Sequence, residues 1–318
     1  MKKKIKSKVN RFFRNLINLI NLIKIFRKGL RIFIIYLLNY LFRKEWGRDL
    51  IYSSFPKNEL LIGNTEEGLH YVINSSDDTI GRIVFRSRKS FDSHHLLISL
   101  KILDVKKKVL LDVGANIGTV GLFAVKQGLV SNCIAFEPDP TNFQLLKTNV
   151  EINNLADKFE LHNVALASDK VGPLLFELSP KNFGDHRIHL SNSSGLFGEE
   201  KRKVITVETN SLNHVCEKIN LDECILSMDT QGFEGDILSG ASSLIDASVP
   251  IITEFYPYCL MRTNGLNKFY SALSKSKYKT FYDLRNPTIS INFSIEEIKK
   301  IAKELGTDGA FTDLLFIK

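Results

Sequence analysis

The first group of residues that could do chemistry is Leu111-Asp112-Val113-Gly114-Ala115-Asn116-Ile117-Gly118, which joins an apolar run to a predicted helix. Gly114 allows a tight turn and the close approach of a ligand to the backbone. The glycine spacing is G-x-x-x-G, so the pyrophosphate-binding G-x-G-x-x-G pattern and the Walker lysine are both missing. This favours a cofactor with a cationic amino-acid end beside Asp112 over NAD or ATP.

A second acid, Glu137, ends the next apolar run in Ala135-Phe136-Glu137-Pro138-Asp139-Pro140. It follows Gly118 by nineteen residues, about where dinucleotide-binding folds keep an acid for the ribose hydroxyls. A carboxylate can accept two hydrogen bonds from a vicinal diol. The position therefore predicts a ribose-binding carboxylate.

Asp229 ends a further apolar run and begins Asp229-Thr230-Gln231-Gly232-Phe233-Glu234. Ligands of open α/β sheets lie at the carboxyl ends of the strands, so we expect Asp229 beside the reactive end of the cofactor. Glu254, at the end of the next predicted strand, points to the same edge. Glu234 opens a predicted helix, and its sequence position suits a helix-dipole role and a functional role equally.

The candidates for drawing a proton from an acceptor are Asp229, His186 and Glu254. His186 has a suitable intrinsic pKa and lies in an irregular stretch, 179–203, that is rich in Gly, Ser, Asn and His. The alternatives are a surface position for His186 and an orienting role for Asp229. No metal-ligand spacing is visible and no metal is expected, although Asp229 and Glu254 could form a carboxylate site.

These residues require a sheet to position them. Apolar runs predict strands at 109–113, 133–136, 159–166, 224–228 and 250–255, with helices at 118–127, 139–153 and 234–245 between them. Strands separated by helices predict a mostly parallel, Rossmann-like α/β sheet covered on both faces. Residues 279–284 and 312–317 are expected to close it as an antiparallel pair.

The expected organisation is a basic amphipathic helical extension at 1–50, short strands and a helix at 51–105, and the catalytic domain at 106–318. Residues 1–50 carry fourteen Lys or Arg and two acids, whereas the other 268 residues carry 29 basic and 33 acidic residues. The basic character therefore belongs to the extension. No nucleic-acid partner is expected, because a base-flipping N-P-P-Y-like motif is replaced by Asp229-Thr230-Gln231-Gly232. The four cysteines form no C-x-x-C and are expected to be buried thiols in a reducing compartment.

Residues 1–45 combine this charge with helical apolar spacing at Ile5, Val9, Phe12, Leu16, Leu19, Ile20 and Ile23. The longest charge-free run, 32–42, has eleven residues, whereas a spanning helix needs about twenty. No signal-peptide cleavage site follows. We expect this segment to bind an anionic membrane surface, which makes the protein cytoplasmic and peripheral. The alternative is a helical arm packed on the domain or on a partner subunit.

Over residues 60 to 284 the chain resembles the FkbM family of methyltransferases. The resemblance rests on DVGANIG (112–118), FEPDPTNFQLLKTNVEIN (136–153), NVALASDKVG (163–172) and MDTQGFEGDILSGA (228–241). It implies a class I methyltransferase fold that uses S-adenosylmethionine. By motif match, Asp112, Gly114, Asn116 and Gly118 would hold the amino-acid end of the cofactor, Glu137 the ribose, and Asn163 to Ala165 the region of the adenine. The block 182–187 would face the active site.

The resemblance also implies O-methylation, and we expect the acceptor to be a sugar hydroxyl of a glycan or glycolipid. A small soluble or lipid acceptor is the alternative within the same chemistry. A non-catalytic, membrane-associated cofactor-binding protein is the alternative of a different class, and the intact motifs argue against it. One departure is Asn213, where many family members have Asp in a T-L-D sequence, so no role is assigned there.

Overall fold

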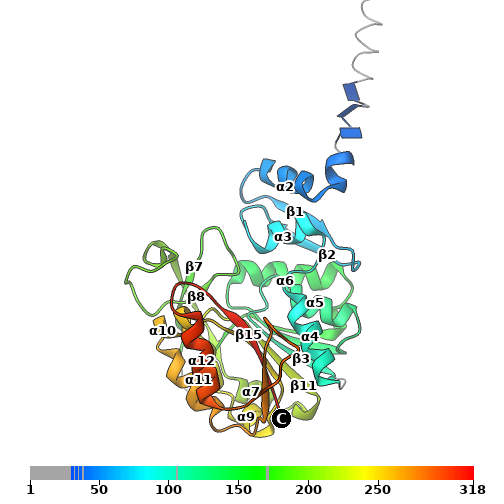
Figure 1. Ribbon diagram of the computed structural model, residues 1–318. Coiled ribbons are helices and arrows are strands. Elements are labelled where there is room, and N and C mark those ends of the chain that lie inside the picture. Colours follow the sequence, from blue (N-terminus) through cyan, green and yellow to red (C-terminus); the bar gives the residue numbers. More distant parts are fainter. Residues whose placement is uncertain (1–29, 32, 35, 38, 105–106, 170–171) are drawn as a thin grey trace, which may run out of the picture. The chain divides into compact units, whose positions relative to one another are not determined.

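The computed structural model describes residues 30–31, 33–34, 36–37, 39–104, 107–169 and 172–318 (Figure 1). The chain divides into two units, residues 1–55 and residues 56–318. Most of the 51–105 segment therefore belongs with the larger unit. The predicted amphipathic stripe of residues 5–23 lies outside the described residues. The smaller unit contains α2 (Glu45–Ser54). Within the described ranges, no helix is long and apolar enough to cross a membrane.

The larger unit is built on an eight-stranded sheet with the order β14-β13-β15-β12-β11-β3-β4-β5. The strands from β12 to β5 pair in parallel, whereas β15 and β13 are antiparallel to their neighbours. This confirms the predicted mostly parallel sheet with antiparallel closing strands. The bounds are β3 Val109–Val113, β4 Asn132–Phe136, β5 Phe159–His162, β11 Cys224–Met228, β12 Ile251–Phe255, β13 Thr280–Asp283, β14 Ile291–Asn292 and β15 Thr312–Ile317.

Helices cover both faces of this sheet (Figure 1). On one side lie α4 (Ser93–Leu103), α5 (Thr119–Lys126) and α6 (Pro140–Ile152). The others are α7 Leu212–Cys216, α8 Glu234–Ser239, α9 Ser242–Ala247, α10 Pro257–Arg262, α11 Gly265–Leu273 and α12 Ile295–Leu305. As predicted, Asp139 caps α6 by accepting a hydrogen bond from Asn142 N, and Pro140 follows it.

Two predicted elements are broken in the structure. The single helix expected at 234–245 is interrupted between α8 and α9, where a side chain at Gly240 would overlap the Ala167 carbonyl oxygen. The strand expected at 159–166 is divided into β5 and β6 (Ala165–Leu166), and β6 pairs with β10 (Thr209–Asn210) outside the main sheet. In both places the chain bends to meet a neighbouring segment.

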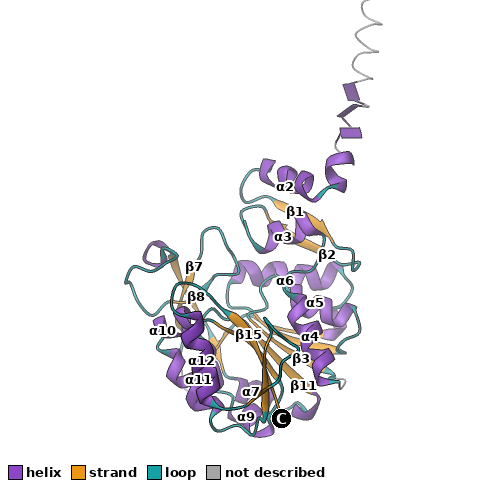
Figure 2. Ribbon diagram, in the orientation of Figure 1, coloured by secondary structure: helices purple, strands orange, loops and turns teal. Residues whose placement is uncertain are grey.

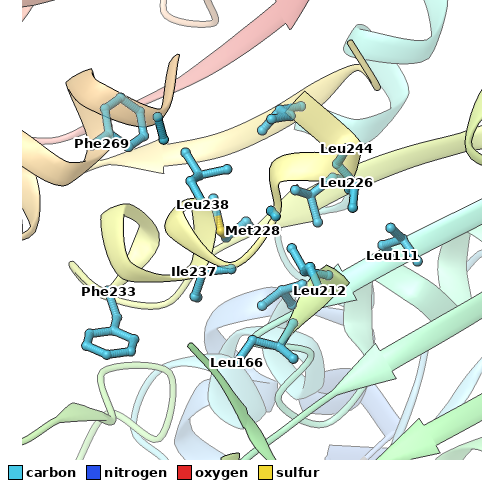
Figure 3. Packing of buried hydrophobic residues seen from close by; sticks show 14 of the residues in the cluster. Leu111, Leu166, Leu212, Leu226, Met228, Phe233, Ile237, Leu238, Leu244 and Phe269 are labelled. Carbon is cyan, nitrogen blue, oxygen red and sulfur yellow. The ribbon is translucent and has the colours of Figure 1, made fainter. Parts of the chain in front are cut away.

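The core lies between the sheet and α8, α9 and α11 (Figure 3). Leu226 and Met228 of β11 meet Ile237 and Leu238 of α8, and all four side chains are buried. Burying an aliphatic side chain of this size contributes about 1.5–3 kcal/mol. The four cysteines are also buried and free, in agreement with the prediction of buried thiols. This packing holds β11 in place, and Asp229 follows directly after that strand.

A hairpin and a short helix precede the main sheet: β1 (Leu60–Asn64), β2 (His70–Asn74) and α3 (Ile80–Ser87). Two buried asparagines hold the hairpin, one in α6 and one directly after it. Asn149 accepts from Val72 N at 2.6 Å, and its amide nitrogen donates to Ile117 O at 3.0 Å. Asn153 bonds both backbone groups of His70. The hairpin thereby delivers α3, and with it Ile80, to the edge of the sheet where the strands end.

The stretch 179–203 is mostly irregular, as predicted, and it is drawn largely as loop in Figure 2. It lies within a separate small sheet of β7 (Leu174–Leu178), β8 (Arg187–Ile188) and β9 (Lys203–Val207). Buried ion pairs hold it, because Arg187 and Arg202 both bind Asp185. Arg202 also lies 3.4 Å from Glu177.

Replacing Asn149 by Ala should destabilise the fold, because it leaves the Val72 N–H without its partner in a buried place. A lost partner of this kind costs about 1–3 kcal/mol. The measurement is urea unfolding followed by circular dichroism. Thr148→Ala is the control on the same helix, since its hydroxyl is exposed and bonds only Gln144 O within the helix. Equal effects of the two substitutions would contradict the role of Asn149.

Candidate active site

Three cavities meet at the carboxyl ends of β3, β4 and β11, and each is named here by a residue that lines it. The Glu137 cavity is lined by the ends of β4 and β6 and by Phe183 and His186 of the 179–203 stretch. The His95 cavity lies against Asp112 to Asn116 and the start of α4. The Glu254 cavity measures about 540 Å³. Ile80 and Asp229 line all three, so the cavities converge at these two residues.

The turn after β3 requires glycine at position 114. Gly114 has a φ of +82°, and a Cβ there would overlap the Asp229 carbonyl oxygen. The backbone N–H groups of Gly114 and Ala115 both donate to Phe136 O at 3.0 Å. The predicted cofactor loop is therefore fixed from both sides by the neighbouring strand ends.

The other residues of this motif divide between the cavity and the scaffold. Asp112 lines the His95 cavity and accepts from Gly121 N, and burial raises the pKa of this carboxyl to about 7. Asn116 lines two of the cavities and donates to Phe183 O at 2.8 Å. Gly118 begins α5 with a φ of +90° and lines none of the three, so its contribution is the turn itself.

Glu137 is buried at the bottom of its cavity. Its two carboxylate oxygens accept from Asn116 N and Asp139 N, both at 2.8 Å. Burial raises the pKa of Glu137 to about 8, while the hydrogen bond from Asp139 opposes that shift. Each oxygen keeps a further lone pair for a ligand hydroxyl. Asn163 holds this strand end by donating to Glu137 O and Pro138 O, and Ala165 lines the same cavity.

His186 lines the Glu137 cavity and is not among the residues that line the Glu254 cavity. Its Nδ1 accepts from Ser179 N at 2.9 Å, and its Nε2 lies 3.8 Å from Asp139 Oδ2. Burial and the charge of Arg202 lower the pKa of His186 to about 4. With Nδ1 engaged as an acceptor, the neutral ring carries its proton on Nε2. A histidine held in this way lacks a free nitrogen to accept a proton.

Asp229 and Glu254 lie together in the Glu254 cavity. Gln231 Nε2 bridges them, donating to Asp229 Oδ1 at 2.8 Å and to Glu254 Oε2 at 2.9 Å. Burial raises the pKa of Asp229 to about 6. Burial and the neighbouring Asp229 raise the pKa of Glu254 well above its ordinary value. Glu254 is buried and Asp229 is exposed to the cavity, so a proton shared by the pair is favoured on Glu254 and the charge on Asp229.

The loop that carries Asp229 is held by Glu234. One carboxylate oxygen of Glu234 accepts from Thr230 N, Thr230 Oγ1 and Gly232 N, at 2.9–3.2 Å. The sequence left a helix-dipole role and a functional role open for Glu234. Its contacts favour a role in organising the loop. This contribution is structural, and it fixes where Asp229 points.

Three residues of the site were missed by the sequence analysis. Asp92 and Asp313 line both the His95 and Glu254 cavities, and His95 lies behind them. His95 Nδ1 is 3.1 Å from an oxygen of each aspartate. The available signal was an acid before a predicted helix start, Asp92-Ser93-His94-His95, which is indistinguishable from an ordinary cap. The His94 ring contacts that of His95 at an interplanar angle of 42°, and 64% of the His94 side chain is exposed, so ion pairing explains this group better than a metal centre.

The site fits S-adenosylmethionine on the structure's own features. It offers a glycine turn without a side chain, a buried carboxylate for vicinal hydroxyls, and an excess of carboxylates where a cationic cofactor would place its charge. The parallel sheet with antiparallel closing strands, and this site at its carboxyl edge, define a class I methyltransferase. Residues 112–285 match the family described as Methyltransferase FkbM domain. The chain belongs to the FkbM methyltransferase family and is an S-adenosylmethionine-dependent methyltransferase.

Similar proteins include 2-O-methyltransferase NoeI of Sinorhizobium fredii (strain NBRC 101917 / NGR234), which is 28% identical over 178 residues, 52% of this chain and 70% of that protein. Among solved structures, Methyltransferase FkbM from Methylobacillus flagellatus KT is 16% identical with a TM-score of 0.39. That alignment covers 66% of this chain and 44% of the other. The O-methyltransferase from Bacillus cereus in complex with SAH is 12% identical with a TM-score of 0.39, covering 71% and 81%.

Glu137→Gln should weaken S-adenosylmethionine binding by about 10–100-fold. Both oxygens of Glu137 accept backbone N–H groups, so the amide nitrogen of a glutamine must face one of those donors and one acceptor is lost. Above pH 8 the Glu137 carboxylate is ionised, and a hydrogen bond to a charged group contributes about 1.5–3 kcal/mol, so the titration is run in that range. The measurement is isothermal titration calorimetry. Glu160→Gln, an exposed acid on β5, is the control and should bind normally; unchanged affinity in Glu137→Gln would remove this residue from the site.

Proposed function

We propose that the protein methylates a hydroxyl oxygen of a sugar in a glycan or glycolipid. The observation that carries this proposal is the Glu254 cavity, which opens onto the convergence point at Asp229 and is large enough for a sugar ring. The name of its relative, a 2-O-methyltransferase, supports an oxygen acceptor.

The walls of the Glu254 cavity suit a sugar. Phe197, Tyr256 and Phe311 form an aromatic side, with ring centroids 6.5 Å apart between Phe197 and Tyr256 and 5.5 Å apart between Tyr256 and Phe311. Carboxylates, among them Asp229 and Asp313, form the polar side. Sugars present both apolar C–H faces and hydroxyl groups, so an aromatic wall opposite hydrogen-bond acceptors matches both.

The chain's own residues account for the proton and for alignment. When bound, S-adenosylmethionine supplies an electrophilic methyl group on a positively charged sulfur that becomes neutral as the methyl leaves. Asp229 accepts the hydroxyl proton, since its carboxyl is ionised near neutral pH and lies where the cavities converge. Gln231 and the protonated Glu254 hold it in place. A positioned base contributes about 10²–10⁴-fold, and alignment can supply about 7–11 kcal/mol.

The acceptor class is tested by methyl transfer from labelled S-adenosylmethionine to fractions of a lysate. Label in polysaccharide or glycolipid supports the proposal. Label confined to small soluble molecules, simple lipids or RNA contradicts it and points to the corresponding alternative.

Asp229→Asn should bind S-adenosylmethionine and transfer methyl at least about 100-fold more slowly, because an amide cannot take up the proton. In the unaltered enzyme, kcat/KM should fall as the pH drops through about 6, the pKa of Asp229, since protonation removes the base. Both are measured by initial rates on the labelled acceptor fraction. Asp246→Asn, an exposed residue of α9, is the control. A pH-independent rate between 5 and 8 would exclude Asp229 as the base.

We also propose that residues 1–45 attach the enzyme to an anionic membrane surface. Residues 1–50 hold an excess of twelve positive charges. In the described part of this unit, Phe33, Tyr36, Tyr40 and Trp46 each expose more than half of their surface. Basic residues beside exposed apolar ones suit the headgroup region of a bilayer. Each basic residue near an anionic leaflet contributes about 1 kcal/mol.

Full-length protein should co-sediment with vesicles containing phosphatidylserine and less well with phosphatidylcholine vesicles, and added salt should weaken the difference. Removal of residues 1–45 should abolish sedimentation and leave S-adenosylmethionine binding unchanged. Equal sedimentation of both proteins, or indifference to lipid charge, would instead favour a protein-docking arm.

A further inference from the structure

Negative charge is concentrated where the three cavities converge. Asp92, Asp229 and Asp313 line both the His95 cavity and the Glu254 cavity. They come from the cap of α4, the end of β11 and the start of β15. The convergence point joins the Glu137 cavity, the His95 cavity beside the Gly114 turn, and the Glu254 cavity. These would hold the ribose, the amino-acid end and the acceptor. The sulfur of the cofactor carries the ribose, the amino-acid chain and the methyl group to be transferred, so it is the atom that this cluster would surround.

The cluster is only partly compensated by protein cations. His95 Nδ1 lies 3.1 Å from both Asp92 Oδ1 and Asp313 Oδ2, so one imidazole serves two carboxylates. Lys181 and Arg202 also line the Glu254 cavity, although neither lines the His95 cavity, and Arg202 is engaged by Asp185 and Glu177. In the empty protein Asp229 is exposed to the cavities, and Asp92 and Asp313 are half-buried. A ligand that fills the cavities removes water from these carboxylates, and a desolvated carboxylate without a cation is unfavourable unless it is protonated or meets a positively charged ligand.

The ionisation of the cluster agrees with this account. Burial raises the pKa of Asp313 to about 7 and that of Asp229 to about 6. Burial opposes the charge on His95, yet Asp92 and Asp313 together raise its pKa. Other titratable groups near the cluster are His94 of α4, Asp112 of β3, Glu254 of β12 and Asp283 of β13. The lining of the Glu254 cavity adds Lys181, Asp185, Arg202 and Tyr256.

We propose that Asp92, Asp229 and Asp313 select the cofactor by the charge on its sulfur, binding S-adenosylmethionine more tightly than S-adenosylhomocysteine. The two molecules share the adenosine and amino-acid parts, so contacts at Glu137 and Gly114 contribute equally to the affinity for each. They differ by a methyl group and one positive charge. Methyl transfer removes that charge, so S-adenosylhomocysteine binds the enzyme more weakly and its release is favoured. This role does not depend on which acceptor is methylated.

Linkage fixes the sign of the pH dependence. A cationic ligand favours the ionised carboxylates and lowers their pKa, so its binding releases protons and strengthens as the pH rises. A ligand with neutral sulfur lacks this coupling. The ratio of the two affinities should therefore increase between pH 5.5 and pH 7, a range in which the α-amino groups of both ligands stay largely protonated.

The experiment is isothermal titration calorimetry with S-adenosylmethionine, S-adenosylhomocysteine and sinefungin, which carries a protonated amine in place of the methyl sulfonium. The unaltered enzyme should favour S-adenosylmethionine by roughly fivefold more at pH 7 than at pH 5.5, the lower end of typical coupling between sites. Asp313→Asn should weaken both cationic ligands by about tenfold at pH 7 and S-adenosylhomocysteine by less than about twofold. Asp246→Asn is the matched control and should change none of the three.

Titrations of the unaltered enzyme at pH 6.5, in two buffers of different ionisation enthalpy, provide a test that needs no variant. S-adenosylmethionine should release more protons on binding than S-adenosylhomocysteine. Equal proton release, or an equal loss of affinity for all three ligands in Asp313→Asn, would overturn the proposal. Failure of the acceptor assignment would leave these binding results unchanged, so the two proposals fail separately.

Discussion

The site depends on how closely the ends of β3 and β11 approach. The two strands pair in parallel up to Val113 and Met228, and Asp229 N then donates to Val113 O at 3.0 Å. At the next position a Cβ on residue 114 would overlap the Asp229 carbonyl oxygen, so only glycine lets the two chains pass. This approach opens the cofactor cavities on one side of the crossing. It also fixes Asp229 at the point where they meet the Glu254 cavity.

A second consequence is that the same edge of the sheet gathers acids, of which Asp112, Glu137 and Glu254 are buried and Asp229 is exposed to the cavities. Asp112, Glu137, Asp229 and Glu254 end or follow strands of the parallel set, and burial raises the pKa of each. An acid that is removed from water costs folding free energy as long as no ligand is bound beside it. Backbone N–H groups and Gln231 offset part of that cost, and a cationic cofactor offsets more. The arrangement therefore lowers the stability of the ligand-free protein, and ligand binding restores that stability.

The sequence allowed prediction of those parts that local rules decide. Apolar runs located the strands, Asp139 and Pro140 located the start of α6, and strand ends located Glu137 and Asp229. The rest needed contacts between distant segments. Asp313 meets His95 only because β15 inserts beside β12, and nothing near position 313 signals that partner. The local sequence allowed His186 to be a general base. The structure shows instead that its Nδ1 accepts from Ser179 N and that burial lowers its pKa.

The 179–203 stretch contributes residues to both the Glu137 cavity and the Glu254 cavity. Phe183 O accepts from Asn116 and Asn142, and Phe183 N donates to Asp77 at the start of α3. Further along, Arg202 donates to Asp185 O at 2.7 Å, while Phe197 contributes to the aromatic wall. One segment is thus anchored at the loop after β3 and also forms part of the Glu254 cavity. Substitutions at its exposed positions can change the wall of that cavity without disturbing the loop after β3, because the anchors of that loop are separate residues.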